Sequence, residues 1–332
     1  MKILIIQTAF IGDVILATPV LEKLHQYFPD AQLDILVRKG TESLFTGHPF
    51  LHKVLVFDKK APKVPTLSAI ISEIREQNYD KVINLHRFGS SGFITMLSGA
   101  KEKIGFDKNP FSFAYTTKLK HVIGNGKHEV ARNLELIAPF TDDKLTPPKL
   151  YPSPIDYESA AQYKSSAYIC IAPSSIWATK ELTYYKWEEL IENVAGRYKV
   201  YLLGAASDVG LCDVIKIQSG EKVGAEKIIN LAGKLSFLQS AALMKDAAMN
   251  YANDSAPMHI ASAMNAPITA VYCSTVPSFG FGPLSDKSFI VETQMPLDCR
   301  PCGLHGYKEC PKGHFLCSLS IKVDQLVKPL ES

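Results

Sequence analysis

The sequence predicts an α/β protein with two domains, each built on a mostly parallel sheet. First, short apolar runs alternate with amphipathic helical patterns along the chain. Second, this alternation stops in a stretch rich in Pro, Lys, Asp and Ser and then starts again. Third, a chain of 332 residues is too long for a single hydrophobic core of ordinary size. Two Rossmann-like domains that face each other across a cleft account for all three observations.

The first half of the chain opens on a buried strand followed by a helix. Pro19 predicts a kink or a break in that first helix, because proline has no backbone N–H to donate. The predicted strands are 2–6, 32–37, 53–57 and 81–85, and the clearest predicted helices are 14–28 and 66–77.

Weak periodicity over residues 141–166 predicts an interdomain linker near 147–165. We therefore expect an N-terminal domain over 1–150 and a C-terminal domain over 151–332. In the second half the predicted strands are 168–172, 199–203, 227–231, 248–252 and 268–273, and the predicted helices are 184–197, 209–218, 237–245 and 256–264.

Composition and charge narrow the class of protein. The chain is 46% hydrophobic and 21% charged, and no apolar stretch is long enough to span a bilayer. The opening MKILIIQTAFIGDVILATP has some features of a signal peptide, but Gly12 and Asp13 interrupt its apolar run, so a buried strand and a helix explain it better. We expect a cytoplasmic protein. Residues 81–132 hold 9 Lys and Arg against 3 Asp and Glu, which suits an acidic partner, although a solvated basic face is the alternative. No nucleic-acid motif accompanies this charge.

Residues 251–267, YANDSAPMHIASAMNAP, read as the end of a buried strand, a tight polar turn and the start of a helix. Asp254 and Ser255 are favoured N-cap residues, and Pro257 is tolerated early in a helix. Backbone N–H groups at such a helix start attract a phosphate or diphosphate. Asp254 would repel a phosphate, so it is better suited to sugar hydroxyls beside it. A capped helix without a ligand is the alternative.

The turn after the first strand places Gly12 and Asp13 at the carboxyl end of that strand. Gly12 permits a tight turn, and Asp13 is either a general base for a sugar hydroxyl or an ordinary N-cap aspartate. No G-x-G-x-x-G follows the strand, which argues against a dinucleotide cofactor.

A second polar turn, in IAPSSIWATKELTYYKW, follows the strand 168–172. Ser174, Ser175 and Thr179 offer hydroxyl groups there, and Lys180 offers a point charge. This combination suits a diphosphate, although a loop lysine by itself is usually only solvated.

Seven cysteines are an odd number, which favours reduced thiols over a disulfide framework. The last four follow the pattern C-x2-C-x7-C-x6-C: Cys299, Cys302, Cys310 and Cys317. The second pair is too widely spaced for the usual zinc knuckle, so we predict a loop of reduced cysteines, with structural zinc as the alternative. No D-x-D motif occurs, and we predict neither a metal nor a cofactor.

Together these segments resemble glycosyltransferase family 9, the ADP-heptose:lipopolysaccharide heptosyltransferases. The opening KILIIQTAFIGDVILATPVLEKLHQYFPDAQLDILV is similar to the start of that family, and KHEVARNLELIAPF to its His-Glu helix. WATKELTYYKWEEL and NLAGKLSFLQSAALMKDAAMNYANDSAPMHIASAMNAPITAVY resemble its donor-domain motifs. The cysteine-rich tail resembles the heptosyltransferase II branch. The resemblance spans nearly the full chain.

The resemblance implies a GT-B fold with the acceptor site in the first domain and the nucleotide-sugar site in the second. It implies inverting, metal-independent transfer of heptose from ADP-heptose to the inner core of lipopolysaccharide, with Kdo–lipid A or heptosyl-Kdo–lipid A as the acceptor. Carried over by position, Asp13 is the general base. The implied substrate-binding residues are Gly12, Ser174, Ser175, Thr179, Lys180, Asp254, Ser255, Ala256 and His259. For His259, a packing role inside the helix is an equal alternative.

Such an acceptor lies in a membrane. We therefore expect a peripheral position at the inner face of the inner membrane, with contact through the basic region and the apolar groups Phe88, Phe93, Phe111 and Phe113.

The chain departs from the family pattern at a few positions. Ala256 stands where glycine is usual, Ser174 and Ser175 where Gly-Ala is common, and Leu182 where Trp is common. These departures keep two alternatives open: a family member that transfers another sugar, and a non-catalytic binder of a nucleotide-sugar or glycolipid. A nucleotide-sugar epimerase on the same fold is a weaker third, because it needs acid/base residues that the sequence does not identify.

Overall fold

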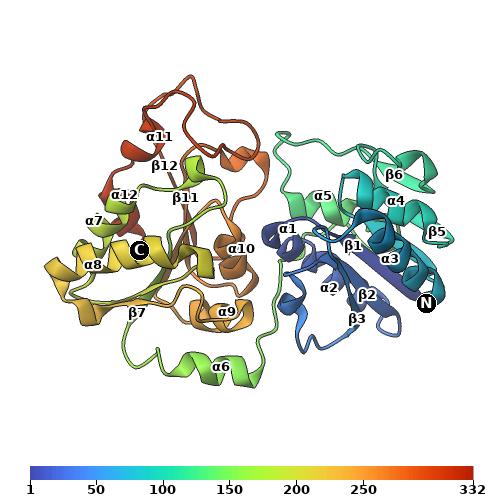
Figure 1. Ribbon diagram of the computed structural model, residues 1–332, viewed down its shortest axis with the longest axis horizontal. Helices are drawn as coiled ribbons and strands as arrows, with labels where there is room; N and C mark the ends of the chain where they lie inside the picture. The colour runs from blue at the N-terminus through green and yellow to red at the C-terminus, as the bar shows by residue number, and fades with distance from the viewer. Residues whose placement is uncertain (332) are drawn as a thin grey trace. The chain divides into compact units, whose positions relative to one another are not determined.

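The computed structural model describes residues 1–331 and divides into two compact units, Met1–Tyr151 and Pro152–Ser332. Both units are α/β, as the sequence predicts (Figure 1). Each contains a six-stranded sheet in which every neighbouring pair is parallel.

The sheet of the N-terminal unit has the strand order β3-β2-β1-β4-β5-β6. Its strands are β1 (Lys2–Gln7), β2 (Gln32–Arg38), β3 (Leu51–Phe57), β4 (Lys81–Asn84), β5 (Glu102–Phe106) and β6 (Thr117–Leu119). β1 and β2 are apolar and buried along almost their whole length, because helices cover both faces of a parallel sheet.

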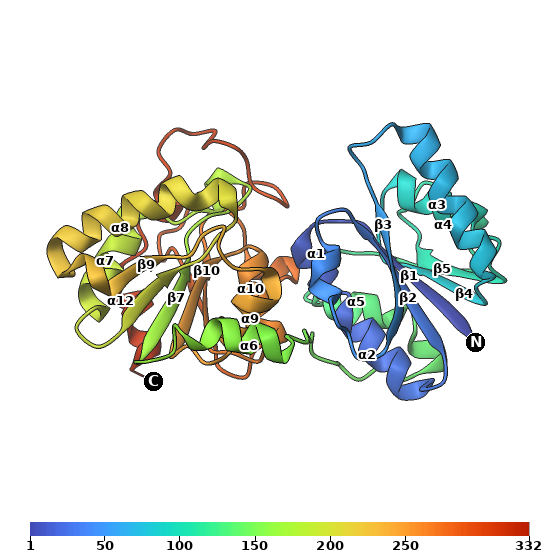
Figure 2. The same cartoon turned by 60° about the horizontal axis from the view of Figure 1, so that its bottom comes forward.

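Five helices surround this sheet: α1 (Ile11–Ile15), α2 (Thr18–Tyr27), α3 (Lys63–Gln77), α4 (Gly89–Leu97) and α5 (Glu129–Glu135). Alternate residues of β1, Leu4 and Ile6, pack in one cluster with Ile70 and Ile74 of α3 and Ile94 of α4. Helices α2 and α5 contact each other and lie on the other side of the sheet (Figure 2).

The C-terminal unit repeats the same topology, with the order β12-β11-β10-β7-β8-β9. Its strands are β7 (Tyr168–Ala172), β8 (Lys199–Leu202), β9 (Ile228–Asn230), β10 (Met249–Asn253), β11 (Ile268–Tyr272) and β12 (Ser288–Glu292). Counted within each unit, both sheets have the doubly wound order 3-2-1-4-5-6.

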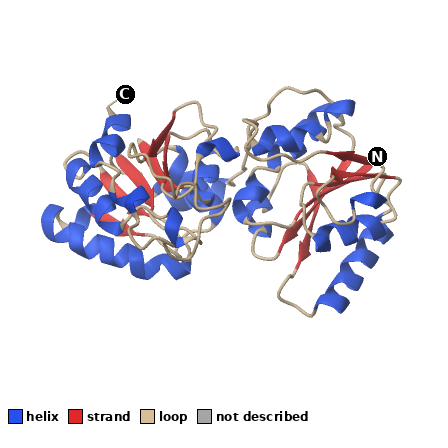
Figure 3. Cartoon of the chain, turned by 90° about the horizontal axis from the view of Figure 1, so that it is seen from above, coloured by secondary structure: helices blue, strands red, loops and turns tan. Residues whose placement is uncertain are grey.

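The helices of the C-terminal unit are α6 (Pro154–Ala161), α7 (Tyr184–Val194), α8 (Val209–Val223), α9 (Phe237–Lys245), α10 (Ala256–Ala263), α11 (Leu316–Leu319) and α12 (Val323–Val327). Trp187 and Ile191 of α7 share a buried cluster with Ile169 and Ile171 of β7. A long loop joins β12 to α11, and we call residues 298–315 of it the cysteine loop (Figure 1). Figure 3 shows the strands of each unit flanked by helices.

Several sequence predictions need correction. The predicted helix 14–28 is two helices, and Pro19 stands at the start of the second, as a break at this proline predicts. Gly12 lies inside α1 and not in a turn that requires glycine. The predicted linker 147–165 contains α6, which packs against α9 and begins with a capping box at Ser153. Strands β5, β6 and β12 are additional to the predicted ones.

Across residues 1–331, the helices are too short or too polar to traverse a bilayer.

Candidate active site

In each unit the strand order reverses between two central neighbours, β1 and β4 in the first sheet and β7 and β10 in the second. Ligands of doubly wound sheets bind outside the carboxyl ends of the strands at such a point. Asp13 lies just after β1. Lys180 and Asp254 lie just after β7 and β10. The three residues with the sharpest predicted roles therefore lie at the two switch points.

Asp13 is half-buried in the first turn of α1. Burial raises the pKa of its carboxyl group, and the negative charge of Glu129 raises it further. Backbone N–H groups and the charge of Arg87 act in the opposite direction, and the resulting pKa is about 6. Such a group is ionised at neutral pH, yet it holds a proton more tightly than an ordinary aspartate, as a general base must.

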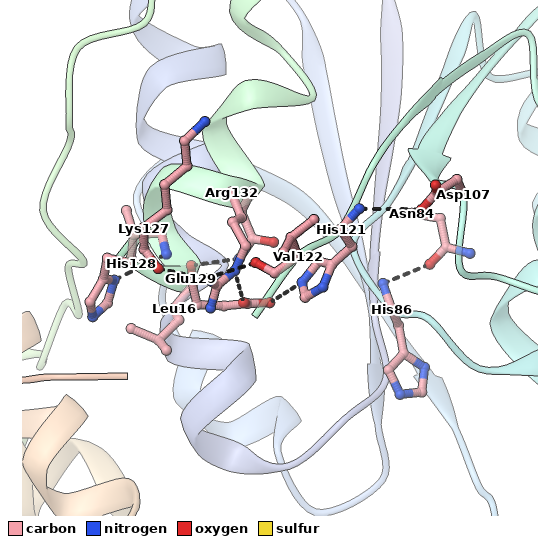
Figure 4. A network of polar contacts seen from close by, with 12 residues as sticks. Leu16, Asn84, His86, Asp107, His121, Val122, Lys127, His128, Glu129 and Arg132 are labelled. Atoms are coloured by element: carbon pink, nitrogen blue, oxygen red, sulfur yellow. Dashed lines mark hydrogen bonds and ion pairs between the residues drawn. The ribbon is translucent and has the colours of Figure 1, made fainter. Parts of the chain in front are cut away.

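The charge of Glu129 is maintained by a buried network on α5 (Figure 4). Its Oε2 accepts a hydrogen bond from Arg132 Nε at 2.7 Å, and its Oε1 lies 3.3 Å from His121 Nε2. Burial alone would raise the pKa of Glu129, but these two partners outweigh it and the pKa is lowered. Glu129 therefore remains a carboxylate inside the unit, close enough to act on Asp13.

The same network is tied to the helix that carries Asp13. Asn133 Nδ2 donates to the carbonyl of Leu16, the residue that ends α1, at 3.3 Å. The guanidinium of Arg132 also donates to the carbonyls of Val122 and Lys127. The sequence indicated the His-Glu helix only through the family resemblance, and its tie to α1 is visible only in three dimensions.

Two cations, Arg87 and Lys59, interact electrostatically with the Asp13 carboxylate. The charge of Arg87 acts on it directly. Lys59 follows β3, and its pKa is lowered by burial and by Arg38 but raised by Asp13. Nothing in the sequence singles out Lys59 or Arg38, because each is an ordinary charged residue at or just after the end of a strand. Their convergence comes from the parallel sheet, which brings the ends of β2, β3 and β4 to one edge.

His86, two residues beyond β4, is a further group that sequence reasoning missed. Its Nδ1 lies 3.1 Å from Thr8 Oγ1, and its backbone N–H donates to Asn84 Oδ1 at 2.9 Å. Burial and the charges of Lys59 and Arg87 lower the pKa of the imidazole to about 3, so the ring is neutral at physiological pH. The available signal was a polar His-Arg pair directly after an apolar strand.

In the C-terminal unit, Lys180 and Asp254 form a nearly buried ion pair. Lys180 Nζ lies 2.6 Å from Asp254 Oδ2 and donates to the Asp254 carbonyl at 3.0 Å. Thr275 Oγ1 donates to the same Oδ2 at 2.7 Å. The two side chains are only 13% and 10% exposed. The sequence predicted separate partners for the lysine and the aspartate, and it did not single out Thr275.

Helix α10 begins without a side-chain cap. Ser255 is the N-cap residue, one of the two positions that the sequence predicts, but its side chain makes no capping hydrogen bond. The Asp254 carboxylate pairs with Lys180 instead. The buried hydroxyls of Ser174 and Ser255 have no hydrogen-bond partner within the described chain. Uncapped N–H groups beside two unpartnered hydroxyls are suited to a group rich in acceptors, such as a diphosphate.

The other predicted binding residues are placed as follows. The backbone N–H of Ser175 donates to Glu181 Oε1 at 2.7 Å. Thr179 is buried, and its hydroxyl is engaged by the cysteine loop. Ala256 is the first residue of α10, and His259 is buried one turn later. Binding roles for these residues stay predictions.

All seven cysteines are free thiols, in agreement with the prediction of reduced cysteines. Cys299 Sγ lies 3.8 Å from His314 Nε2. Over residues 1–331, no three His, Cys, Asp or Glu side chains are arranged to hold a metal ion.

Residues 67–307 match the family described as glycosyltransferase family 9 (heptosyltransferase). The chain belongs to this family, and it is a glycosyltransferase. The resemblance read from the sequence is therefore confirmed.

Lipopolysaccharide heptosyltransferase 3 of Escherichia coli is 28% identical over 283 residues, which is 80% of this chain and 82% of that protein. Lipooligosaccharide heptosyltransferase 2 of Haemophilus influenzae is 26% identical over 309 residues, 88% of each chain. The structure of E. coli ADP-heptose lipopolysaccharide heptosyltransferase II aligns with a TM-score of 0.81 at 20% identity, covering 100% of this chain and 98% of that one. This last likeness confirms the predicted fold, two Rossmann-like units of the GT-B class.

Proposed function

We propose that this glycosyltransferase moves heptose from ADP-heptose to the inner core of lipopolysaccharide, with inversion at the anomeric carbon and without a metal ion. The family and the named relatives support the sugar and the class of acceptor. The observation that carries the mechanism is Asp13, a carboxylate with a pKa of about 6 at the switch point of the N-terminal unit.

In the proposed reaction, the acceptor hydroxyl transfers its proton to the Asp13 carboxylate while its oxygen attacks the anomeric carbon. The bond between that carbon and the diphosphate oxygen breaks, and its electron pair leaves with ADP. Attack from the face opposite the leaving group inverts the configuration. Asp13 must be deprotonated for this step, which its pKa of about 6 allows at neutral pH.

We assign the nucleotide-sugar to the C-terminal domain, 151–332. The diphosphate would draw Lys180 away from Asp254, and the hydroxyls of Ser174 and Ser255 would gain the acceptors that they lack. The freed Asp254 carboxylate, still held by Thr275, would then accept hydrogen bonds from the sugar. The departing ADP gains negative charge, which Lys180 and the start of α10 stabilise in place of a metal ion.

We assign the acceptor to the N-terminal domain, 1–150. Lys59, Arg87 and Arg38 form a positive environment next to the base. Kdo carboxylates or core phosphates are anions that such cations would hold. Neutral His86 would add one hydrogen bond without adding charge.

We further propose peripheral contact with an anionic membrane surface through this same edge of the N-terminal sheet. Phe10, Phe88 and Phe113 are 50%, 62% and 73% exposed and follow β1, β4 and β5. Two of the predicted contact residues, Phe93 and Phe111, are less suited to this role. Both are half-buried, and their rings pack edge to face with centroids 5.5 Å apart.

Only some of the Lys and Arg residues in the basic region, 81–132, are available for this contact. Lys81 and Lys101 lie at the amino edge of the sheet, where they pair with Glu102 and Asp80. Arg132 is buried against Glu129. Lys108 and Lys120 are exposed cations that directly follow β5 and β6, at the carboxyl edge.

ADP release from the purified protein, given ADP-heptose with and without heptosyl-Kdo–lipid A or Kdo–lipid A, tests the proposal. We expect acceptor-dependent release and a product heavier by one heptose. Donor binding without transfer to either acceptor would favour a non-catalytic binder. Absence of donor binding would favour a family member that uses another nucleotide-sugar.

A further inference from the structure

The cysteine loop makes direct contact with the turn that carries Lys180. The backbone N–H of Tyr307 donates to Thr179 Oγ1 at 2.7 Å, and the backbone N–H of Thr179 donates back to the Tyr307 carbonyl at 3.1 Å. Thr179 Oγ1 also lies 3.1 Å from Ser274 Oγ. Thr179 and Ser274 are buried. The residue directly before Lys180 is therefore held by a segment more than a hundred positions away.

The same loop is fastened to the segment that carries Thr275. Arg300 Nε donates to the Cys273 carbonyl at 2.7 Å, and its terminal NH2 donates to the carbonyls of Tyr272 and Thr275 at 3.1 and 2.7 Å. A salt bridge of 2.6 Å to Glu292 completes its partners. Arg300 thus holds the carbonyl groups of Tyr272, Cys273 and Thr275 at and just after the end of β11, and Thr275 is the threonine that supports Asp254.

Gly306, the neighbour of Tyr307, leaves no room for a side chain beside the Lys180 turn. Its φ is +77°, a conformation that side chains rarely adopt. A Cβ atom at this position would lie 2.8 Å from Thr179 Oγ1, 3.1 Å from Ser274 Oγ and 3.2 Å from Lys180 Cγ. These contacts are shorter than van der Waals distances, so any side chain here must displace the lysine turn or the loop.

We infer that the cysteine loop is a positioning element of the donor site: through Gly306 and Arg300 it fixes Lys180 and Thr275 on either side of Asp254. The inference rests on the proposed assignment of the nucleotide-sugar to these residues. It gives a role to a loop that the sequence predicted only as a set of reduced thiols. Gly306 and Arg300 touch neither the sugar nor the reacting atoms in this assignment. They act through the ion pair.

Gly306→Ala tests the inference, with Gly313→Ala as the matched control. Gly313 lies in the same loop with φ +72°, but a Cβ there would meet nothing within 4 Å. The two variants therefore share the conformational strain, and only Gly306→Ala presses on the lysine turn. We expect Gly306→Ala to raise the KM for ADP-heptose and the Kd for ADP by about 10-fold or more, the effect of misplacing one charge-assisted hydrogen bond.

The KM for the acceptor should stay within about twofold of wild type in both variants, since the loop holds only the donor residues. A general loss of structure would change both constants together. If Gly306→Ala fails to fold, Arg300→Lys decides, because lysine keeps the charge but cannot reach three carbonyl groups and Glu292 at once. Its Kd for ADP should also rise by about 10-fold.

Two results overturn the inference, and they differ. If wild type binds ADP and Gly306→Ala matches Gly313→Ala, or Arg300→Lys matches wild type, the loop does not position the donor site and the proposed function stands. If wild type binds neither ADP nor ADP-heptose, the donor assignment fails and the inference fails with it.

Discussion

Asp13 shows how one residue acquires its property from its surroundings. Its position after β1 follows from the sequence, but its pKa of about 6 follows from burial and from Glu129, 116 positions later in the chain. A raised carboxylate pKa has a cost: the ionised form is less stable in the folded protein than in the unfolded chain. The native protein accepts this cost at the position where the proposed reaction needs a base.

Asp13→Asn should therefore be much slower than wild type but more stable. We expect a loss of about 10²–10⁴ in rate, with the Kd for ADP unchanged, because general-base catalysis has this magnitude. Wild-type kcat/KM should rise with pH through an apparent pKa of about 6, and this limb should be absent from the residual rate of the variant. Normal turnover by Asp13→Asn would remove Asp13 as the base.

The stability of Asp13→Asn has its own pH dependence. Burial raises the pKa of Asp13 in the folded protein from 3.8 to about 6. The contribution of protonated Asp13 to the free energy of unfolding is therefore fully present below about pH 4 and is lost as the pH rises through about 6. Asparagine removes this fall. The variant should gain about 1–3 kcal/mol at pH 7.5 and nothing at pH 3.5, measured by urea unfolding, while exposed Asp30→Asn should gain little at either pH.

Glu129→Gln should move the pH limb of kcat/KM to lower pH, because it removes a negative charge that raises the pKa of Asp13. It should also cost about 3 kcal/mol of stability, since it leaves Arg132 and His121 without their buried carboxylate. Glu135→Gln, at the other end of α5, breaks only the partly exposed pair with Lys127 and should move neither quantity. A fixed limb in Glu129→Gln would show that Glu129 does not act on the base.

At the scale of elements, periodicity predicted most of the β-strands and helices because their apolar faces are long enough to show it. Strands β5 and β6 escaped prediction because they are short and because polar residues or glycine interrupt their apolar pattern, as in EKIGF and TKL. The turns after β7 and β10 were visible as Ser, Lys and Asp residues that follow buried strands. Their pairing was not visible, since Lys180 and Asp254 are joined only when the two strands become neighbours.

Lys180→Ala tests whether the turn after β7 binds the donor. Loss of one charge-assisted hydrogen bond should raise the Kd for ADP-heptose by about 10- to 100-fold, measured by calorimetry. Lys186→Ala, near the start of α7, removes a lysine whose one ion pair within residues 1–331 is with Glu189, and it should leave the affinity unchanged. Equal donor affinity in the two variants would exclude Lys180 from the site.

At the scale of the whole molecule, the two units share one topology, so each gathers its polar residues at the same edge of a doubly wound sheet. The sequence predicted this repetition from the restart of the strand–helix alternation. It could not predict which exposed groups share an edge, because loops far apart in sequence meet only when the strand order is known. The cations Lys108 and Lys120 and the exposed Phe10, Phe88 and Phe113 are such groups.

Binding to anionic vesicles should depend on both kinds of group at that edge. We expect the triple variant Phe10→Ser/Phe88→Ser/Phe113→Ser to bind phosphatidylglycerol vesicles more weakly, because each substitution removes apolar surface that would contact the membrane. Lys108→Gln/Lys120→Gln should weaken binding mainly at low salt, because charges at a membrane surface act over a Debye length of about 10 Å at 0.1 M. Ile217→Ser removes an equally exposed apolar group from α8 of the other unit and should have no effect. If vesicle binding changes neither with salt nor with either set of substitutions, the proposed membrane surface is wrong. That result would not affect the proposed transfer reaction, which can be measured with a detergent-solubilised acceptor.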